Sequence, residues 1–482
     1  MYDRMPTLTK AQMTKIHDAA MNILSSVGVA FNEAESLDIF KKNGFKVDGK
    51  TVFFSENEVR GALESAPQHF TLAARNPAKS VQLGDDDFAF VPGYGAPFII
   101  LSDGGKRNAT MEDYDNFCKL VQTSKYIDMN GFMMVEPSDI PPETAHLDML
   151  LSSIVLCDKP FMGSPVSKEG ARDAIEMAGL IWGGKEKIKE TPVTVSLINS
   201  LSPLQFSEEM AGSLIELARY GQACVLASLA MAGASGPVEI AGVLAMQNAE
   251  ILAGLTLAQL VRPGVPIIYG STSSPMDMRT GGLSIGAPEL SMIVSCTAQM
   301  ARFYHLPSRS GGGLTDANFP DAQAGIESAM ALITAARNGI NFILHACGIL
   351  GAYVAMSYEK FIIDEELCGM VKKLIEPIEI SDATLDLATI EEVGIGGNFL
   401  TQPKTFELCR TAFFLPELMT VQDYDGWQSK GGKRTDERAS DLLNKRLANY
   451  EKPDIDPAIE AELSEYVTRR KTGRSKQWQG GD

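Results

Sequence analysis

A repeated alternation of short apolar strands and longer helices constrains the fold of this chain more than any other feature of its sequence. The strands are predicted near 88–102 and at 129–135, 160–164, 192–198, 223–230, 265–271, 306–311 and 341–346, each followed by a turn or helix. Eight strand–helix units at spacings of about 30–40 residues are typical of a (β/α)8 TIM barrel. A doubly wound open sheet is the alternative, but no GxGxxG phosphate turn follows the first strand. We therefore predict an α/β fold of the TIM-barrel type.

Segments of a different character flank these units. Residues 1–86 contain amphipathic helices and then short strands separated by turns, which predicts a helical and β-meander extension. Residues 87–380 hold the predicted barrel. Residues 381–482 contain a glycine-rich segment and further helices, which we expect to pack on the barrel.

Composition limits the class of protein. The 482 residues are 45% hydrophobic and 22% charged, which is typical of a globular protein with a full core. The net charge of −18 argues against electrostatic binding to nucleic acid or to an anionic membrane. No uninterrupted apolar run reaches the length of about 18–20 residues that spans a bilayer, and the N-terminus lacks an apolar signal core. Seven scattered cysteines predict reduced thiols in a cytoplasmic enzyme. We also expect a homo-oligomer, although burial in the barrel explains the apolar segment 237–261 equally well.

In a barrel of this type, function lies where the strands end. The predicted strand ends carry Tyr94, Glu136, Ser164, Asn199, Ser228, Ser271, Arg309 and His345. This set has one histidine, one carboxylate and no lysine, so it offers no obvious pair for general acid–base catalysis. It favours a reaction in which the protein binds and positions the substrate while another molecule supplies the reactive centre.

The strand predicted at 341–346 delivers the most reactive side chains. His345 and Cys347 are two residues apart, so on a regular strand they face the same space. A zinc ion held by both residues is one possibility, with a third ligand from Cys224, Cys296, Cys368 or Cys409. The alternatives are a buried Cys347 that acts as a small hydrophobic residue and a His345 that is hydrogen-bonded inside the mouth.

Aromatic residues near the predicted mouth are the second feature. They are Tyr94 and Phe98 in a glycine-rich bend, Tyr353 and Phe361 after the last strand, and Trp427 in the C-terminal region. Aromatic faces bind quaternary ammonium groups by cation–π attraction, worth about 0.5–2 kcal/mol each. A single aromatic residue is more often part of the core, so a cage requires that several of them converge.

Several sequence runs together resemble the trimethylamine methyltransferase family over nearly the whole chain. They are 278–282 (MRTGG), 301–309 (ARFYHLPSR), 315–324 (TDANFPDAQA), 392–400 (EVGIGGNFL) and Trp427 with the glycines at 431–432. The resemblance implies a (β/α)8 barrel that moves a methyl group from an amine to the cobalt of a separate corrinoid protein. No counterpart of pyrrolysine is present, so the chain is similar to the branch that demethylates glycine betaine and related quaternary amines. Asn398 stands where many relatives have histidine, and Lys404-Thr405 where they have histidine-threonine.

The resemblance implies the following roles. A quaternary amine leaves as a neutral tertiary amine when it loses a methyl group to cob(I)alamin on the partner, so the enzyme needs no metal and no permanently bound cofactor. His345 is the expected catalytic residue. The expected substrate-binding residues are Tyr94, Phe98, Arg309, Gln323, Tyr353 and Phe361, and the expected positioning residues are Asp316, Asn199 and Glu136. A zinc-dependent thiol methyltransferase that uses His345 and Cys347 and a non-catalytic betaine-binding barrel are the alternatives.

Overall fold

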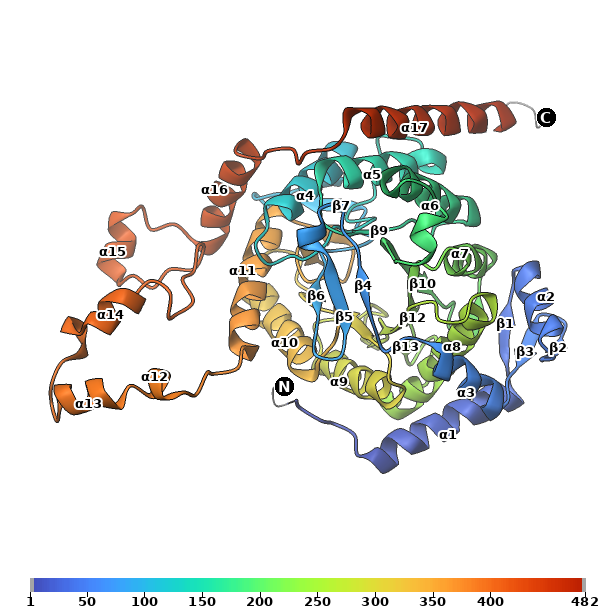
Figure 1. Cartoon of the computed structure of the whole chain (residues 1–482), viewed down its shortest axis with the longest axis horizontal. Coiled ribbons are helices and arrows are strands. Elements are labelled where there is room, and N and C mark those ends of the chain that lie inside the picture. The colour runs from blue at the N-terminus through green and yellow to red at the C-terminus, as the bar shows by residue number, and fades with distance from the viewer. Residues whose placement is uncertain (1–3, 479–482) are drawn as a thin grey trace.

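A parallel sheet of seven strands forms the centre of the molecule (Figure 1), and the computed structural model describes residues 4–478 around it. The order across the sheet is β6 (Ala89–Phe90), β17 (Phe342–Leu344), β16 (Ser308–Gly311), β14 (Ile267–Ser271), β12 (Ala223–Ser228), β10 (Thr194–Asn199) and β9 (Phe161–Met162). Each neighbouring pair is parallel. The α/β class and the parallel sheet predicted from the sequence are confirmed.

Helices surround the strands, as Figure 1 shows. They are α4 (Met111–Thr123), α5 (Pro142–Leu156), α6 (Lys168–Trp182), α7 (Glu208–Arg219), α8 (Ile240–Val261), α9 (Pro288–Phe303), α10 (Ala322–Asn338) and α11 (Tyr358–Ile375). Side chains of Ser167, Ser207, Asp321 and Ser357 accept hydrogen bonds from the first free amides of four of these helices. Such capping residues begin helices because those amides have no partner within the helix.

The predicted strand at 129–135 is wrong, because these residues form only isolated bridges. The Asp128 amide donates to the Phe90 carbonyl at 2.9 Å on one side, and the Asn130 amide donates to the Pro160 carbonyl at 2.7 Å on the other. Gly131 follows at once, and glycine weakens the interior of a strand. The predicted strand at 341–346 also ends early, at Leu344.

The N-terminal region forms an appendage on the outside of the helices. It consists of α1 (Lys10–Ser26), β1 (Val29–Phe31), α2 (Ala34–Lys42), β2 (Lys46–Asp48), β3 (Thr51–Phe53) and α3 (Glu56–Ser65). Strand β1 pairs with β11 (Gln205–Phe206), and the rings of Phe31 and Phe206 stack with centroids 5.1 Å apart. The predicted β meander is divided: β4 (His69–Leu72) and β5 (Val81–Gly84) form a hairpin around the short helix Pro77–Lys79, whereas β6 joins the main sheet.

Short strands also form beyond the carboxyl ends of the main strands. One small sheet contains β7 (Phe98–Ile100), β8 (Lys106–Asn108), β18 (Ile349–Leu350) and β19 (Ala355–Met356), and β13 (Met231–Ala232) pairs with β15 (Ser274–Pro275). These pairings fix the loops that surround the predicted mouth.

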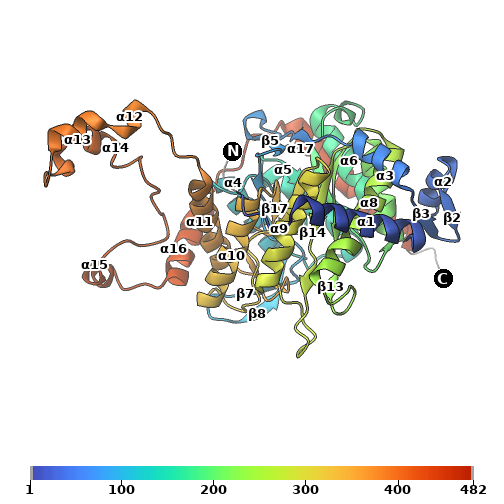
Figure 2. The ribbon, with the colours of Figure 1, turned by 90° about the horizontal axis from the view of Figure 1, so that it is seen from below.

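The C-terminal region crosses the outside of the molecule. Its elements are α12 (Asp382–Leu385), α13 (Leu387–Val393), the short helix Phe399–Thr401, α14 (Pro403–Leu408), α15 (Tyr424–Ser429), α16 (Thr435–Ala448) and α17 (Pro457–Trp478). Helix α16 packs on α11, and α17 lies across α5 and α6. In contrast, α12, α13, α14 and α15 project away from the body (Figures 1 and 2).

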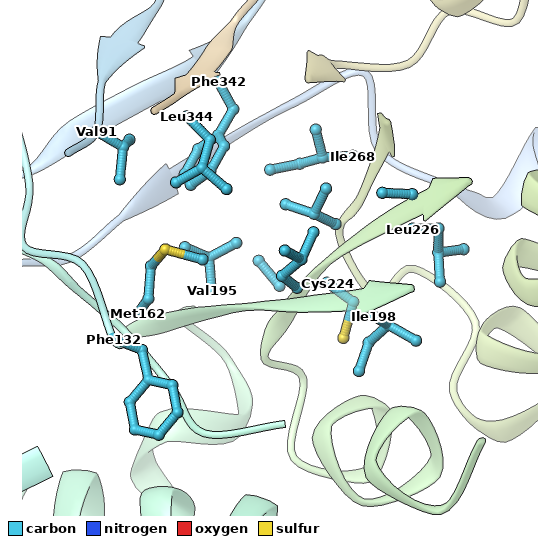
Figure 3. Close-up of a cluster of buried hydrophobic side chains, with 14 of the residues drawn as sticks. Val91, Phe132, Met162, Val195, Ile198, Cys224, Leu226, Ile268, Phe342 and Leu344 are labelled. Atoms are coloured by element: carbon cyan, nitrogen blue, oxygen red, sulfur yellow. The ribbon is translucent and has the colours of Figure 1, made fainter. Parts of the chain in front are cut away.

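One continuous hydrophobic core joins the sheet to its helices. Figure 3 shows apolar side chains from several strands packed together, among them Met162, Val195, Leu226, Ile268 and Leu344. Helix α8 is the one helix of residues 4–478 that is long and apolar enough to cross a bilayer, but 83% of its apolar window is buried inside the protein. That burial is the arrangement of a core helix.

Candidate active site

The loop after β17 carries two aromatic side chains on an unusual backbone. His345 has a φ of +58° and Tyr353 a φ of +74°. Non-glycine residues seldom adopt this left-handed conformation, and those that do cluster at functional sites. Backbone hydrogen bonds hold His345, whose amide donates to the Pro92 carbonyl at 3.1 Å and whose carbonyl accepts from the Gly313 amide at 2.7 Å. The loop therefore presents both rings in a fixed geometry.

Three aromatic rings converge here. The ring of His345 lies 4.9 Å from that of Tyr353 and 6.5 Å from that of Tyr94, measured between centroids. Tyr94 contacts His345 in an edge-on orientation, and the adjacent Gly95 has a φ of +85°, so a bend in the backbone brings Tyr94 to this position. The structure thus brings together three of the predicted site residues from two different loops.

Arg309 completes this cluster from β16. Its side chain is fully buried, and its Nη1 donates to the carbonyl oxygen of Ser271 at 2.8 Å. Its Nε and Nη2 have no hydrogen-bond partner among residues 4–478, and none of the ion pairs found there includes it. Burial of a cation without a counter-ion lowers the stability of a folded protein by roughly several kcal/mol, because the ion loses its hydration. The arrangement therefore favours an anionic ligand.

Burial sets the charge state of the cluster. It lowers the pKa of Arg309 to about 10, although Tyr353 and Tyr94 oppose the shift. It lowers the pKa of His345 well below its ordinary value, and the positive charge of Arg309 adds to this effect. It raises the pKa of Tyr353 to about 12 and that of Tyr94 further. At pH 7 the two tyrosines and His345 are neutral, and the guanidinium carries the charge of the cluster.

Other polar side-chain atoms on the main strands and on the loops after them are buried without partners inside the described part of the chain. They are Nδ1 of His345, the hydroxyl of Tyr353, Oδ1 of Asn199, and the hydroxyls of Ser164, Ser196 and Ser274. Buried polar atoms are normally hydrogen-bonded, so several unpaired atoms on neighbouring strands and the loops after them indicate a ligand or water site. Asn199 ends β10, as predicted. Ser196 and Ser274 were missed, and the signal for Ser196 was a polar residue in the middle of an apolar strand.

Two other predicted strand ends are engaged in structural hydrogen bonds. The Ser271 hydroxyl donates to Oε1 of Gln247 on α8 at 2.8 Å. The Ser228 hydroxyl lies 3.4 Å from that of Ser202. Both serines connect a strand end to its surroundings.

Asp316 and Gln323 belong to a network that joins two loops. The Asp316 carboxylate accepts from the amides of Ile285 and Gly286 at 2.8 and 3.0 Å. The Glu327 carboxylate accepts two hydrogen bonds, one from the backbone amide of Asp316 at 2.8 Å and one from Nε2 of Gln323 at 2.9 Å. Asp316 also influences Tyr353 electrostatically. Gln323 is solvent-exposed and does not reach the His345 cluster by any of these contacts.

Phe98, Glu136 and Phe361 lie in other surroundings. Phe98 and Glu136 line a separate cavity of about 570 Å³, together with Met133, His146 and Met149 among others. Phe361 is fully buried, with its ring 5.8 Å from that of Phe117. Trp427 lies on α15, where its indole nitrogen donates to the Lys433 carbonyl at 2.9 Å. The structure therefore does not group these aromatic residues with Tyr94 and Tyr353.

The expectation that His345 and Cys347 share one space is wrong. The strand ends at Leu344 and His345 has a left-handed backbone, so the alternation of a strand does not extend to Cys347. Cys347 is fully buried and its electrostatic neighbours are Cys368 and Asp364, and burial raises the pKa of its thiol. Across residues 4–478, no group of three or more histidine, cysteine, aspartate or glutamate side chains is arranged to hold a metal ion.

A buried ion pair on α11 is hydrogen-bonded to the loop after β17, which carries His345. Lys360 and Asp364 on α11 have no exposed surface, and the Lys360 ammonium donates to both carboxylate oxygens of Asp364. Asp364 Oδ2 accepts from the Gly348 amide at 2.9 Å. The same ammonium donates to the Ser328 hydroxyl at 2.8 Å. The pair thereby ties the loop that carries His345 to α10 and α11.

Comparison with known proteins confirms the resemblance noted from the sequence. Residues 1–475 match the trimethylamine methyltransferase (MTTB) family. The glycine betaine methyltransferase of Desulfitobacterium hafniense strain Y51 is 48% identical over 463 residues, which cover 96% of each chain. The proline betaine:corrinoid methyltransferase of Eubacterium limosum is 33% identical over 473 residues, which cover 94% of this chain and 95% of that relative.

A solved structure supports the fold. The monomethylamine methyltransferase of Methanosarcina barkeri matches with a TM-score of 0.54 at 14% identity, over 94% of this chain and 90% of that chain. At this level of identity the match concerns the fold alone. The family match over nearly the whole chain and the two betaine methyltransferase relatives lead to one conclusion: this chain belongs to the trimethylamine methyltransferase family.

Proposed function

We propose that this enzyme transfers a methyl group from a quaternary amine that also carries a carboxylate, of the glycine betaine type, to cob(I)alamin on a partner corrinoid protein. The observation that carries the proposal is the Arg309 guanidinium, which has no ion-pair partner among residues 4–478 and lies within a cluster of aromatic rings. The names of the two betaine methyltransferase relatives agree with it.

The charge distribution of the cluster suits a zwitterion. A guanidinium binds a carboxylate through two parallel hydrogen bonds, and Nε and Nη2 of Arg309 are the two donors that have no partner among the described residues. The rings of Tyr94 and Tyr353 offer aromatic faces for a trimethylammonium group. Because His345 is neutral at pH 7, it does not repel the cation.

The residues of this chain bind, orient and exclude water. Methyl transfer from a quaternary nitrogen releases a neutral tertiary amine, so no side chain has to donate or accept a proton. Cob(I)alamin, when its carrier is bound, supplies the nucleophile that accepts the methyl group. The fixed backbone at His345 and Tyr353 reduces the loss of freedom when the substrate is aligned.

The loops around the site form a surface that fits a protein partner. Six apolar side chains are exposed on the loops beyond the strands: Val166, Leu201, Leu229, Val238, Met278 and Val354. Exposed apolar side chains gathered around a site mark interaction surfaces. We propose that this rim binds the corrinoid protein, and that Met278 and Val238, 65% and 66% exposed, make the largest contacts.

We further propose that the sheet closes into a full (β/α)8 barrel, with residues 128–136 in the place of the eighth strand. The support is the pair of backbone hydrogen bonds by which this segment joins β6 on one side and reaches Pro160, next to β9, on the other. Closure would place all the strand ends around one mouth.

A spectroscopic assay tests the proposed activity. The purified enzyme, with cob(I)alamin and glycine betaine, is expected to form methylcobalamin, whereas choline, which lacks the carboxylate, is expected to react much more slowly. Formation of methylcobalamin from choline and glycine betaine at equal rates would contradict the role of Arg309. Betaine binding without methyl transfer, even with a cognate corrinoid protein, would favour the non-catalytic alternative. Stoichiometric zinc in active enzyme would favour the thiol methyltransferase.

A further inference from the structure

Residues 376–416 form an extended segment, here called the arm, that leaves the body of the protein (Figures 1 and 2). The arm starts directly after α11. At its other end, the amides of Glu417, Leu418 and Met419 donate to the Glu366 carboxylate on α11 at 2.8, 2.7 and 2.6 Å. Both ends of the arm are therefore attached to one helix, while its middle lies away from the body.

The arm has no core of its own. Its helices α12, α13 and α14 contain 4, 7 and 6 residues, and none of these residues is buried. Isolated helices shorter than about 12 residues are marginal in water, and most helix stability in proteins comes from packing of an apolar face. A partner surface is therefore needed to hold this conformation.

The arm exposes an unusual number of large apolar side chains. They are Ile378, Ile380, Leu385, Leu387, Ile390, Ile395, Phe399, Leu400, Phe406, Leu408, Phe413 and Leu415. Phe406 and Phe413 are 84% and 78% exposed. At about 150 Å² for a whole ring, the exposed fractions of the three phenylalanines of the arm together supply roughly 300 Å². With nine aliphatic side chains, the arm reaches the area of about 800 Å² per partner that a stable interface buries.

We propose that the arm packs against a second copy of this chain, which places its own arm on the first in a two-fold arrangement. The outer surface of α11 continues the apolar surface of the arm, because Met370 and Leu374 are exposed just before it. A two-fold interface uses the same surface of both copies. The arm of each chain can therefore cover the arm of the other, and the apolar side chains of both are buried. Permanent interfaces of this kind are more apolar than transient ones.

The position of the arm separates it from the surface proposed for the corrinoid protein. Figure 2 shows α12, α13 and α14 projecting at the upper left, whereas β7, β8 and β13, which follow the main strands, lie along the lower edge of the body. A carrier that delivers and removes a methyl group has to dissociate in each cycle. The arm, in contrast, exposes apolar side chains and has no core of its own, so it requires a partner that stays bound.

Light scattering after size exclusion tests the proposal without any assay of activity. The wild-type protein is expected to have the mass of two chains or of a larger even number. The dissociation constant of the assembly is expected to rise at least about 30-fold in the double variant Phe406→Ser/Phe413→Ser, because the variant loses two central apolar contacts. The control Val27→Ser/Ile326→Ser removes two side chains that are 56% and 69% exposed on the body, and it is expected to keep the wild-type mass.

Hydrogen exchange gives the second measurement. The amides of α13 and α14 are expected to exchange slowly in the wild type and rapidly in the arm variant, while the amides of the sheet stay protected in both. A wild-type protein of single-chain mass, or an arm variant that keeps the full assembly, would overturn the proposal. Protection of the arm only after addition of a corrinoid protein would also overturn it, because the arm would then bind that partner.

Discussion

Arg309 is the residue on which the proposed chemistry depends most. Its guanidinium is buried among neutral aromatic rings and has no ion-pair partner in the described part of the chain, so its burial lowers the stability of the folded protein. Replacing a buried unpaired charge with an apolar side chain of similar length usually stabilises a protein. Arg309 thus links high affinity for an anion with lower stability of the free enzyme.

The substitution Arg309→Met separates these two effects. We expect the melting temperature of the free enzyme to rise, because the buried charge is gone. We expect kcat/KM for glycine betaine to fall by at least about 100-fold, since the variant loses two hydrogen bonds to a charged group, each worth about 1.5–3 kcal/mol. Differential scanning calorimetry and the methylcobalamin assay measure the two quantities. A fall in both stability and activity would indicate a structural role for Arg309.

Tyr353 allows a test of the aromatic contribution. The variant Tyr353→Phe keeps the ring, so we expect activity close to that of the wild type. The variant Tyr353→Leu keeps apolar bulk but loses the ring face, and we expect KM to rise about 5- to 30-fold, the equivalent of a desolvated cation–π contact. Equal KM values for the two variants would show that the ring of Tyr353 does not contact the cation.

The sequence predicted well which residues end the strands, but it predicted poorly which side chains lie close to those residues. Asn199, Ser228 and Ser271 each end a strand, as the spacing of the strand–helix units predicted. The isolation of Arg309 depends on which side chains the neighbouring strands bring close, and spacing carries no information about that. Phe361 was predicted to bind substrate because it follows the last strand, but it lies on the face of α11 that packs on Phe117.

At the scale of elements, the Lys360–Asp364 pair joins α11 to the loop of His345. Burial raises the pKa of Asp364 to about 6, although Lys360 opposes this shift. Removal of one partner leaves an uncompensated buried charge, whereas removal of both leaves an apolar gap. The pair therefore contributes strongly to the position of the loop only while both members are present.

A double-mutant cycle measures this coupling. We expect Lys360→Met to reduce the free energy of unfolding by about 3–5 kcal/mol, and Asp364→Leu to do the same. The double variant is expected to lose less than the sum of the two single variants, because it contains no unpaired charge. Urea unfolding gives all four values. Additive losses would contradict a direct coupling between the two residues.

Element boundaries show why other predictions from sequence failed. Residues 129–135 are apolar enough for a strand, yet Gly131 and the bonds to two different neighbours leave only bridges. The loop after β17 was expected to continue the strand, but the backbone reverses at His345. Both differences arise from tertiary hydrogen bonds, which local periodicity does not encode.

At the scale of the whole molecule, a buried carboxylate holds the C-terminal helix. Asp173 on α6 accepts from Nε2 of His146 on α5 at 2.9 Å, and from Tyr466 and Arg470 on α17 at 2.7 and 2.6 Å. Burial by itself raises the pKa of Asp173, but hydrogen bonds from His146, Arg470 and Tyr466 outweigh it and lower the pKa to about 2. The ionised form is therefore the one that the folded protein favours.

The stability of the protein is expected to depend on pH through this group. Because the folded pKa of about 2 is below the ordinary value of 3.8, the contribution is complete above pH 3.8 and is lost as the pH falls towards 2. The variant Asp173→Asn is expected to unfold more easily at pH 7 and to lose less further stability in this range. The control Asp441→Asn removes an exposed pair with Lys433, in which the two side chains are 59% and 48% exposed, and little change is expected. Thermal unfolding across the pH range provides the comparison.

The left-handed backbone at residue 345 also limits which mutations evolution can explore there. Histidine, asparagine, aspartate and glycine tolerate this conformation, whereas valine, isoleucine and threonine do not. New substrate preferences in descendants of this enzyme should therefore arise at positions such as Tyr94, which lacks a positive φ. Position 345 should accept only the few residue types that tolerate a positive φ.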